Sequence, residues 1–492
     1  GRRPHQGMVD GVIPAPTGWY RALCDADPTL EAVLQAFGGP CAASACSLHA
    51  VDAWAVGAEP TLRSGIAQGL QGEVDTDQIH MFARRTHAVA VLLQKLGFRT
   101  LWMGLLARTA EVLHGPPPRA LRVRAVADFY YSQGARLHHT ATTAPRTMAA
   151  LVATTTWTDV HPGIAHGRLV GAGPAGPVHI NVLRADSPRL QCVDLRDDPR
   201  NFAEAVSARG AIAGVSGGFF LYSEPDIVPP LQRRQPVGLL VCDGVVQGIP
   251  GLRRATLVVD PSPRITRMGP VGWTVGHGAD TWTIAACNDP TIPGPTLFTR
   301  VHGRRAPRPG LGFAGRHTLG WTDEIPLLGG VVVIPGARRL TEAVPLVWTP
   351  PAPIQQAMAG GPMLLGDPPN LDLAREDFCG TAPPITFSTD ETYDQNLLPR
   401  MAAGIDHQGR LVFAAIDGRD FHRAPGFTLA MTAQLMAALG CGRAMNLDGG
   451  SSKRMAIAGA LVDLSSTEVQ TGTAPTKTPV RKVVSAILVH GR

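Results

Sequence analysis

Near the C-terminal end of the chain, residues 429–452 read LAMTAQLMAALGCGRAMNLDGGSS. The apolar run from Leu429 to Leu439 has the length and composition of a helix, and Gly440-Cys441-Gly442 ends it. The short step Ala444-Met445 then predicts a strand. The stretch therefore predicts a helix, a strand and a polar loop in direct succession.

The polar loop is Asn446-Leu447-Asp448-Gly449-Gly450-Ser451-Ser452, which combines one carboxylate, two glycines and two hydroxyls. Glycines lack a Cβ, so the backbone can come close to a ligand and direct its N–H groups at it. Hydroxyls add hydrogen-bond donors, and a carboxylate beside them is suited to acid–base, nucleophilic or metal chemistry. This mixture suits an anionic, oxygen-rich ligand better than a hydrophobic core.

The overall composition predicts a soluble globular protein of two or three domains. The chain has 492 residues, 44% of them hydrophobic and 17% charged, and no apolar run approaches the roughly 20 residues of a membrane helix. The net charge of +6 comes from scattered basic residues, which are more typical of a solvated surface than of a binding face. We therefore expect a small-molecule substrate, with no nucleic-acid partner and no membrane span. The oligomeric state stays open.

Cysteine content and the first residues bear on the cellular compartment. The eight cysteines are too sparse for a disulfide scaffold, and most are expected to be buried thiols. No apolar segment follows Gly1-Arg2-Arg3-Pro4, so no secretory signal is predicted. A cytoplasmic location is slightly favoured, with secretion after processing as the alternative. Abundant Ala, Gly and Pro with few Lys are typical of a GC-rich bacterial genome.

The chain has two regions that differ in their predicted secondary structure. Residues 1–150 are predicted to be helix-rich, with helices at 29–37 and 77–96; Asp75-Thr76-Asp77 offers N-caps for the second, and Gly97 ends it. The role of this region is open, and substrate gating, partner binding and oligomerisation are the options. Cys41, Cys46 and His49 have a faint zinc-site spacing, but no second pair follows, so core cysteines are the better interpretation.

Residues 157–490 alternate short apolar runs with turn signals, which predicts many strands and few helices. Asp243-Gly244 predicts a hairpin turn, and Asp417-Gly418 repeats the pattern after a strand at 411–416. The fold class expected is therefore α+β, with large mixed or antiparallel sheets and a few flanking helices. The other predicted strands lie at 178–183, 211–215, 237–242, 256–259, 282–287 and 483–489. Surface loops are expected at 348–355, 366–398 and 464–480.

Further segments contain residue types that are common in active and binding sites, although each also has a purely structural interpretation. Gly217-Gly218-Phe219-Phe220 and Gly360-Gly361-Pro362 follow apolar runs and could be tight turns. Asn288-Asp289 before a proline is most often a turn as well. Arg400 at the start of an apolar strand is either a surface charge or a bidentate clamp for phosphate or carboxylate.

Taken in order, these segments resemble the phosphodiester glycosidase family over roughly residues 157–490. Three residues depart from that family's usual pattern: Ser216 stands for Asn, Met401 for Thr, and Ser451 for a third glycine. The elements that carry the resemblance are Gly217-Gly218-Phe219-Phe220, the hairpin at 236–244, Gly360-Gly361-Pro362, Pro399-Arg400 through Gly404-Ile405, Asp417-Gly418 and Asn446 through Ser452.

The resemblance implies a hydrolase that cleaves the glycosidic C–O bond of a sugar-1-phosphodiester, giving free sugar and a phosphomonoester. Asp448 is the first candidate for the acid–base or nucleophilic carboxylate, and Arg400 for the phosphate clamp. Asp417 and Asp289 compete for the role of second carboxylate, although a turn role is the commoner one for each. The candidates for substrate and phosphate binding are Gly217, Gly218, Phe219, Asn288, Gly360, Gly361, Asn446, Gly449, Gly450, Ser451 and Ser452.

Two other functions compete with this one. A phosphodiesterase would cut the P–O bond, usually with two metal ions held by clustered His and Asp, and no such cluster is visible near the motifs. A non-catalytic carbohydrate- or phosphate-binding module is the second, supported by the Ser216 and Ser451 departures. No cofactor is required by the proposed reaction, and a divalent cation such as Ca²⁺ or Mg²⁺ is possible.

Overall fold

The computed structural model describes residues 65–116, 119–220, 234–260, 262–315, 317–326, 328–337, 344–366, 371, 373–377, 395–473 and 480–491. These fall into two compact units: residues 65–142 and 468–473 belong to the first, and the remainder to the second. The helix predicted at 29–37 and the Cys41, Cys46 and His49 pattern lie outside the described residues.

Three helices make up most of the described first unit: α5 (Thr76–Lys95), α6 (Arg99–His114) and α7 (Arg119–Thr142), which pack on one another. The Asp75 side chain caps α5 by accepting a hydrogen bond from the Gln78 backbone N–H at 2.9 Å. Gly97 follows the helix with φ +77°, a left-handed conformation that favours glycine. The predicted helix at 77–96 and its caps are confirmed. Among the described residues of both units, no helix is long and apolar enough to cross a membrane.

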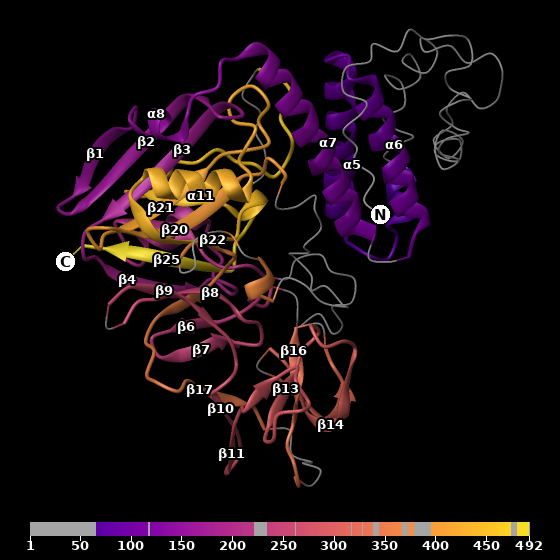
Figure 1. The fold of residues 1–492 in the computed structure, drawn as a ribbon, viewed down its shortest axis with the longest axis vertical. Helices are drawn as coiled ribbons and strands as arrows, with labels where there is room; N and C mark the ends of the chain where they lie inside the picture. The colour runs from indigo at the N-terminus through magenta and orange to yellow at the C-terminus, as the bar shows by residue number, and fades with distance from the viewer. Residues whose placement is uncertain are drawn as a thin grey trace. The chain divides into compact units, whose positions relative to one another are not determined.

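The second unit is built around an antiparallel seven-stranded sheet, here called the first sheet (Figure 1). Two helices, α8 (Met148–Val152) and α11 (Leu429–Ala438), cover one face through an apolar cluster that includes Ile180, Ile416 and Leu435. The strands, in spatial order, are β1 (Thr156–His161), β2 (Ile164–Gly173), β3 (Gly176–Ala185), β21 (Leu411–Ile416), β20 (Arg400–Asp406), β22 (Cys441–Leu447) and β19 (Met363–Leu365).

Two five-stranded antiparallel sheets share an apolar cluster with the other face of the first sheet. Leu183, Phe413 and Met445 of the first sheet meet Val215 and Met358 there. The second sheet consists of β24 (Ala460–Leu461), β23 (Met455–Ile457), β5 (Ala213–Ser216), β25 (Ser485–His490) and β4 (Arg189–Asp194), and α9 (Phe202–Ser207) lies against it. The third consists of β7 (Val245–Gly248), β6 (Leu240–Cys242), β18 (Ala357–Ala359), β8 (Arg254–Val258) and β9 (Arg264–Met268).

The remaining strands form two smaller sheets of the same unit. One contains β11 (Asp280–Thr283), β10 (Thr274–His277) and β17 (Val347–Thr349). The other contains β12 (Ala286–Cys287), β13 (Thr296–Phe298), β16 (Gly329–Val333), β14 (Arg305–Ala314) and β15 (His317–Glu324). The β12–β13 pair is parallel, whereas the other pairs are antiparallel. With short 3-10 turns η3 (Leu373–Arg375) and η4 (Gly450–Ser452), the architecture is α+β, as the sequence predicts.

The two predicted hairpin turns have different outcomes. Asp243 and Gly244 have φ +49° and +78° and join β6 to β7, which is the two-residue turn expected of Asp-Gly. Asp417-Gly418 makes no hairpin, because β21 pairs with β3 and β20, both of which precede it in the chain. The predicted loop at 348–355 begins inside β17, and the loops at 366–398 and 464–480 lie partly outside the described residues.

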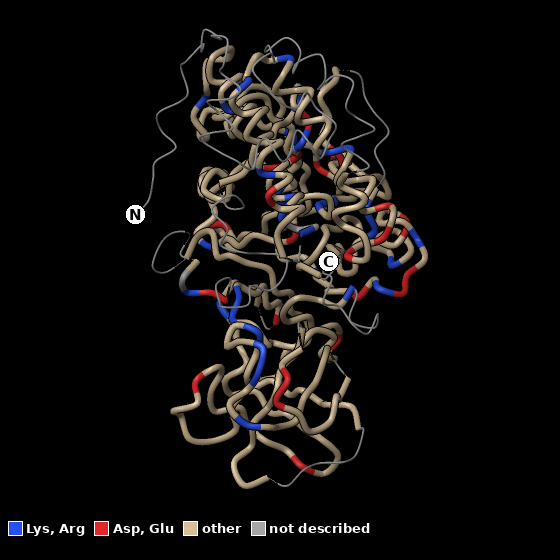
Figure 2. Tube along the Cα trace, turned by 90° about the vertical axis from the view of Figure 1, so that its right-hand side faces the viewer, with Lys and Arg blue, Asp and Glu red and all other residues tan. Residues whose placement is uncertain are grey.

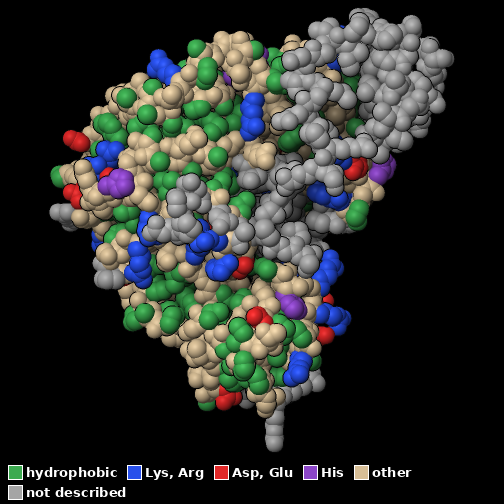
Figure 3. All heavy atoms as spheres, in the orientation of Figure 1, with side chains coloured by type: hydrophobic (Ala, Val, Ile, Leu, Met, Phe, Trp, Pro, Cys, Tyr) green, Lys and Arg blue, Asp and Glu red, His purple; other side chains and the backbone are tan. Residues whose placement is uncertain are grey.

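The distribution of charged residues and the state of the cysteines are those that the composition predicts. Basic and acidic residues are both scattered along the described trace (Figure 2), and charged and apolar side chains are intermixed on the face in Figure 3. Cys192, Cys242, Cys287 and Cys441 are free thiols, and burial raises the pKa of the last three to about 12. These groups are expected to be unreactive.

A buried carboxylate joins two strands, β8 and β19, and yields a stability prediction. The Glu376 side chain accepts hydrogen bonds from the backbone N–H of Ala255 (2.9 Å) and of Met363 (2.7 Å). Replacing Glu376 with Ala leaves both donors without their acceptor, so the free energy of unfolding should fall by about 2–4 kcal/mol. The measurement is the denaturant midpoint of the full chain.

Asp323 supplies the matched control, because its ion pair with Arg305 at 3.0 Å is solvent-exposed. Asp323→Ala should change stability by less than about 1 kcal/mol. Equal effects of the two substitutions would contradict the role assigned to Glu376.

Candidate active site

The loop after β22 carries the chain from the first sheet to the second. β22 ends at Leu447, and β23 of the second sheet begins at Met455. Two backbone hydrogen bonds fix the loop at its start: Asp448 N–H donates to the Gly217 carbonyl (3.1 Å), and Gly450 N–H to the Pro399 carbonyl (2.8 Å). The ends of β5 and β22 and the beginning of β20 therefore meet here.

Glycines are required where these segments touch, because their backbones are in contact. A Cβ on Gly218 would lie 2.2 Å from the Ala359 carbonyl oxygen, and one on Gly360 would lie 2.4 Å from that of Asn446. A Cβ on Gly449 would lie 2.6 Å from the Pro399 oxygen. Such distances exclude any side chain. The structure thus brings three of the predicted glycine motifs together around residues 446–452.

Asn446 and Phe219 are buried beside this junction. The Asn446 side-chain amide donates to the Gly361 carbonyl at 3.0 Å, while Gly361 N–H donates to the Asn446 carbonyl at 2.7 Å. These bonds tie β22 to the turn at Gly361. Phe219 is 3% exposed and belongs to the apolar cluster under α11.

The loop itself contains backbone donors for which the described residues supply no acceptor. Gly450 N–H is bonded to Pro399 as described, and Ser452 N–H donates to the Gly449 carbonyl at 3.0 Å. For the amide N–H groups of Gly449 and Ser451, the described residues supply no acceptor. Both residues are buried, whereas Asp448 is partly exposed. Buried amides normally have partners, so this pair is suited to an anionic ligand.

An arginine that the sequence analysis did not select lies against the loop. Arg419 adopts φ +60°, a strained backbone conformation for a non-glycine residue. Its Nη1 donates to Ser451 Oγ (3.3 Å) and to the Ser466 carbonyl (3.1 Å), and it would lie 3.5 Å from a Cβ on Gly450. The only sequence signal was its position in Asp417-Gly418-Arg419.

Arg400, the predicted phosphate clamp, is 1% exposed. Its Nε donates to the Phe427 carbonyl at 3.0 Å and its Nη2 to the Asn396 carbonyl at 3.1 Å. These bonds hold the segment that leads into α11. Its role as a clamp stays a prediction.

A buried charge cluster joins the end of the loop to β21. The Lys453 side chain is fully buried, and its ammonium contacts the carboxylates of Asp417 and, at 2.8 Å, Asp463. Asp463 also accepts from Met455 N–H at 2.7 Å and lies 3.5 Å from the Arg454 guanidinium. Burial lowers the pKa of Arg454, with the two carboxylates opposing that shift. Sequence reasoning missed Lys453 and Asp463.

Asp417 has a second partner, His179 of β3. Asp417 Oδ2 contacts His179 Nδ1, and Oδ1 accepts from Lys453 and from Leu464 N–H at 3.1 Å. His166 on neighbouring β2 bonds instead to the Asn181 side chain at 2.9 Å, and burial lowers its pKa. Asp417 is therefore a buried carboxylate within a network and not a turn residue.

Asn288 and Asp289 form a turn at β12 and β13. Asn288 Oδ1 accepts from Thr299 N–H at 2.7 Å, and Asp289 Oδ1 accepts from Thr291 N–H at 2.9 Å. The Thr291 hydroxyl and amide hold the pKa of Asp289 below its usual range. Their hydrogen bonds stay within residues 287–299, so the described structure does not join them to residues 446–452.

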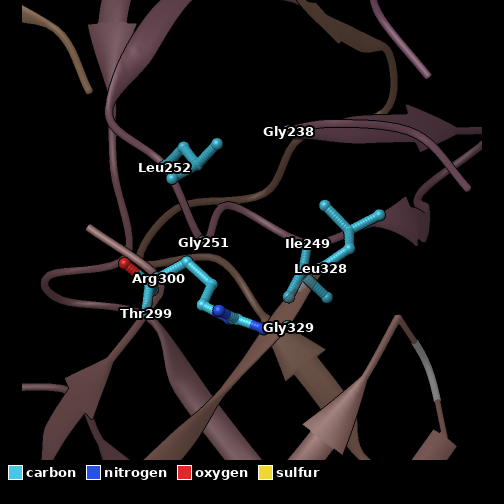
Figure 4. A pocket seen from close by; sticks show the side chains of 8 residues that line it. All are labelled: Gly238, Ile249, Gly251, Leu252, Thr299, Arg300, Leu328 and Gly329. Atoms are coloured by element: carbon cyan, nitrogen blue, oxygen red, sulfur yellow. The ribbon is translucent and has the colours of Figure 1, made fainter. Parts of the chain in front are cut away.

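A small pocket lies near this turn and is lined in part by Gly238, Leu252, Thr299 and Leu328 (Figure 4). The Arg300 side chain extends across it toward Gly329. None of the residues predicted for the site lines this pocket. Elsewhere among the described residues, no group of three or more His, Cys, Asp or Glu is placed to hold a metal ion.

Similarity to known proteins bears on the family to which the domain is related. A comparison with curated proteins finds no match. Among solved structures, a hypothetical protein from Synechocystis has 20% identity and a TM-score of 0.44, and the alignment covers 72% of this chain and 65% of that one. A protein from Burkholderia pseudomallei has 22% identity and a TM-score of 0.43, over 65% and 75% of the two chains.

The catalytic domain of zebrafish N-acetylglucosamine-1-phosphodiester α-N-acetylglucosaminidase, described as auto-inhibited by its pro-peptide, has 15% identity and a TM-score of 0.39, over 69% of this chain and 88% of that one. A family model described as phosphodiester glycosidase matches residues 296–490, a range that contains the motifs at 360–362, 399–405 and 446–452. The resemblance predicted from the motifs is confirmed for this part of the chain: residues 296–490 match the phosphodiester glycosidase family model.

Proposed function

We propose that the protein hydrolyses a sugar-1-phosphodiester at its glycosidic C–O bond, releasing the free sugar and a phosphomonoester. The family match supports this reaction class. The observation that carries the proposal is the partly exposed Asp448 next to two buried amides, of Gly449 and Ser451, for which the described residues offer no acceptor.

The leaving group sets the demands on such a site. An ordinary glycosidase must protonate a departing alkoxide with a general acid. A phosphomonoester leaves as a stable anion, so strong protonation matters less. The site needs instead to bind the phosphate and stabilise positive charge that develops on the sugar ring.

The loop offers donors for the phosphate. Gly449 and Ser451 supply the two amide N–H groups, and Ser452 adds a hydroxyl in the same segment. Arg419 contributes positive charge directly beside Gly450. Donors fixed in advance need no reorganisation when charge develops on the leaving group, which is the main source of electrostatic catalysis.

In this proposal, Asp448 is the group that acts on the sugar. Its backbone N–H is held by the Gly217 carbonyl, and the residue is partly exposed next to the two amides of the proposed phosphate site. A carboxylate there stabilises an oxocarbenium-like sugar or attacks the anomeric carbon as a nucleophile. Gly217, Gly218, Gly360 and Gly361 then act by allowing the backbones around Asp448 to pack closely.

Asp448→Asn tests this assignment. Amide replacement removes the negative charge with little change in volume, so kcat on a sugar-1-phosphodiester should fall by a factor of about 10² to 10⁴. The assay measures free sugar from a panel of α- and β-linked sugar-1-phosphodiesters and nucleotide sugars. Asp323→Asn, at an exposed position, is the control and should retain wild-type turnover. Full turnover by Asp448→Asn would remove Asp448 from the chemistry.

A second pair of variants identifies the phosphate-binding arginine. If Arg419 binds the anion, Arg419→Gln should raise KM about 10-fold or more, the cost of one charge-assisted hydrogen bond. Arg400→Gln should mainly lower the thermal unfolding temperature, because Arg400 holds the carbonyls of Phe427 and Asn396. The reverse pattern, with KM raised only by Arg400→Gln, would assign the clamp to Arg400.

A further inference from the structure

His179 lies at the same end of the first sheet as the candidate site, and the proposed function has not yet used it. The last paired residues of β3 and β21 are Ile180 and Ile416, and Asp417 N–H then donates to the His179 carbonyl at 3.0 Å. The two side chains meet through His179 Nδ1 and Asp417 Oδ2. Cross-strand pairing therefore holds the imidazole and the carboxylate side by side.

The hydrogen bond fixes the tautomer of the imidazole. A carboxylate only accepts hydrogen bonds, so Nδ1 must carry the proton. In the neutral ring, Nε2 then carries the lone pair and is able to take up a proton. The His179 side chain keeps 15% of its surface exposed, and within the described ranges no hydrogen bond to Nε2 occurs. The basic nitrogen is thus the accessible one.

Asp417 is held too firmly to act on a substrate directly. Its carboxylate is 1% exposed, and its other oxygen accepts from Lys453 and from Leu464 N–H. Both oxygens are therefore engaged inside the protein. A buried carboxylate that orients an accessible imidazole is the arrangement by which enzymes position a histidine base.

The strand order places this pair at the same end of the first sheet as the loop at residues 446–452. β3, β21, β20 and β22 are neighbours, and extending their registers aligns residues 179, 417, 399 and 449 in one row. Three strand spacings of about 4.8 Å put the outer two Cα atoms roughly 14 Å apart. Asp417 also reaches the end of the loop directly, because its carboxylate contacts the ammonium of Lys453, the residue that follows Ser452.

We propose that His179 is the second acid–base group of the site, and this proposal rests on the proposed function. Nε2 takes a proton from the water whose oxygen forms the new bond to the anomeric carbon. The bond from that carbon to the phosphate oxygen breaks, and its electron pair leaves with the phosphomonoester. The imidazolium is stabilised by Asp417 and returns its proton to solvent after product release.

Several titratable and charged groups lie around the His179 imidazole. Asp417 is in direct contact, Lys453 and Asp463 lie beyond it, and His166 is the titratable neighbour on β2. His166 is bonded to Asn181 and not to Asp417. It therefore offers a matched control for the loss of one imidazole from this part of the sheet.

The test compares His179→Ala and His179→Gln with His166→Gln. Both His179 variants should lower kcat by about 10² to 10⁴ while KM changes by less than about 3-fold. Added imidazole should restore turnover in His179→Ala, because the vacated space admits the missing base. It should not restore Asp448→Asn. His166→Gln should retain turnover, and thermal unfolding of each variant shows whether the fold survives.

Two results would overturn the proposal. One is wild-type kcat in His179→Gln. The other is a loss of kcat in folded His179→Ala that imidazole does not restore, which assigns His179 a structural role. Both results are measured against a wild-type protein that is active on a sugar-1-phosphodiester. A wild type that releases no sugar from any phosphodiester instead overturns the proposed function itself, and the role of His179 falls with it.

Discussion

The buried ammonium of Lys453 is the contact on which the site depends. It bridges Asp417, which follows β21 of the first sheet, and Asp463, which follows β24 of the second. Burying a charge costs several kcal/mol unless partners surround it, so this lysine is stable only when both carboxylates are in place. The pairing therefore links the two sheets at the point where the chain crosses between them.

The crossing determines what the loop can do. Lys453 fixes its end, and the bonds to Gly217 and Pro399 fix its start. Between these points the glycines let the backbone pass against β20 with no side chain in between, which leaves amide groups rather than side chains as the nearest donors. In our proposal the loop recognises an anion through backbone geometry, so substrate specificity is sensitive to the residue at position 451.

Local features of the fold were predictable from sequence, and long-range ones were not. The Asp75 cap and the Asp243-Gly244 turn depend on neighbours within a few residues, so local chemistry determines them. The glycine motifs at 217–218, 360–361 and 449–450 come together in the structure, because close backbone contact requires glycine and so leaves a sequence signal. Asp417 was interpreted as a turn residue because Asp-Gly is a turn signal. Its actual neighbours depend on strand pairing that no local pattern encodes.

The same limit explains the residues that were missed. His179 and Asp417 are 238 positions apart, and only the insertion of β21 beside β3 brings them together. Lys453 follows the motif directly, but its burial results from the second sheet. Arg419 lies two residues from Asp417, and its contact with Ser451 likewise joins segments that are distant in sequence.

The central claim is that the bond broken is the one between the anomeric carbon and oxygen. Hydrolysis of a sugar-1-phosphodiester in ¹⁸O-labelled water, followed by mass analysis of both products, measures this directly. The account predicts the label in the released sugar and none in the phosphomonoester. Label in the phosphomonoester would show P–O cleavage and contradict it.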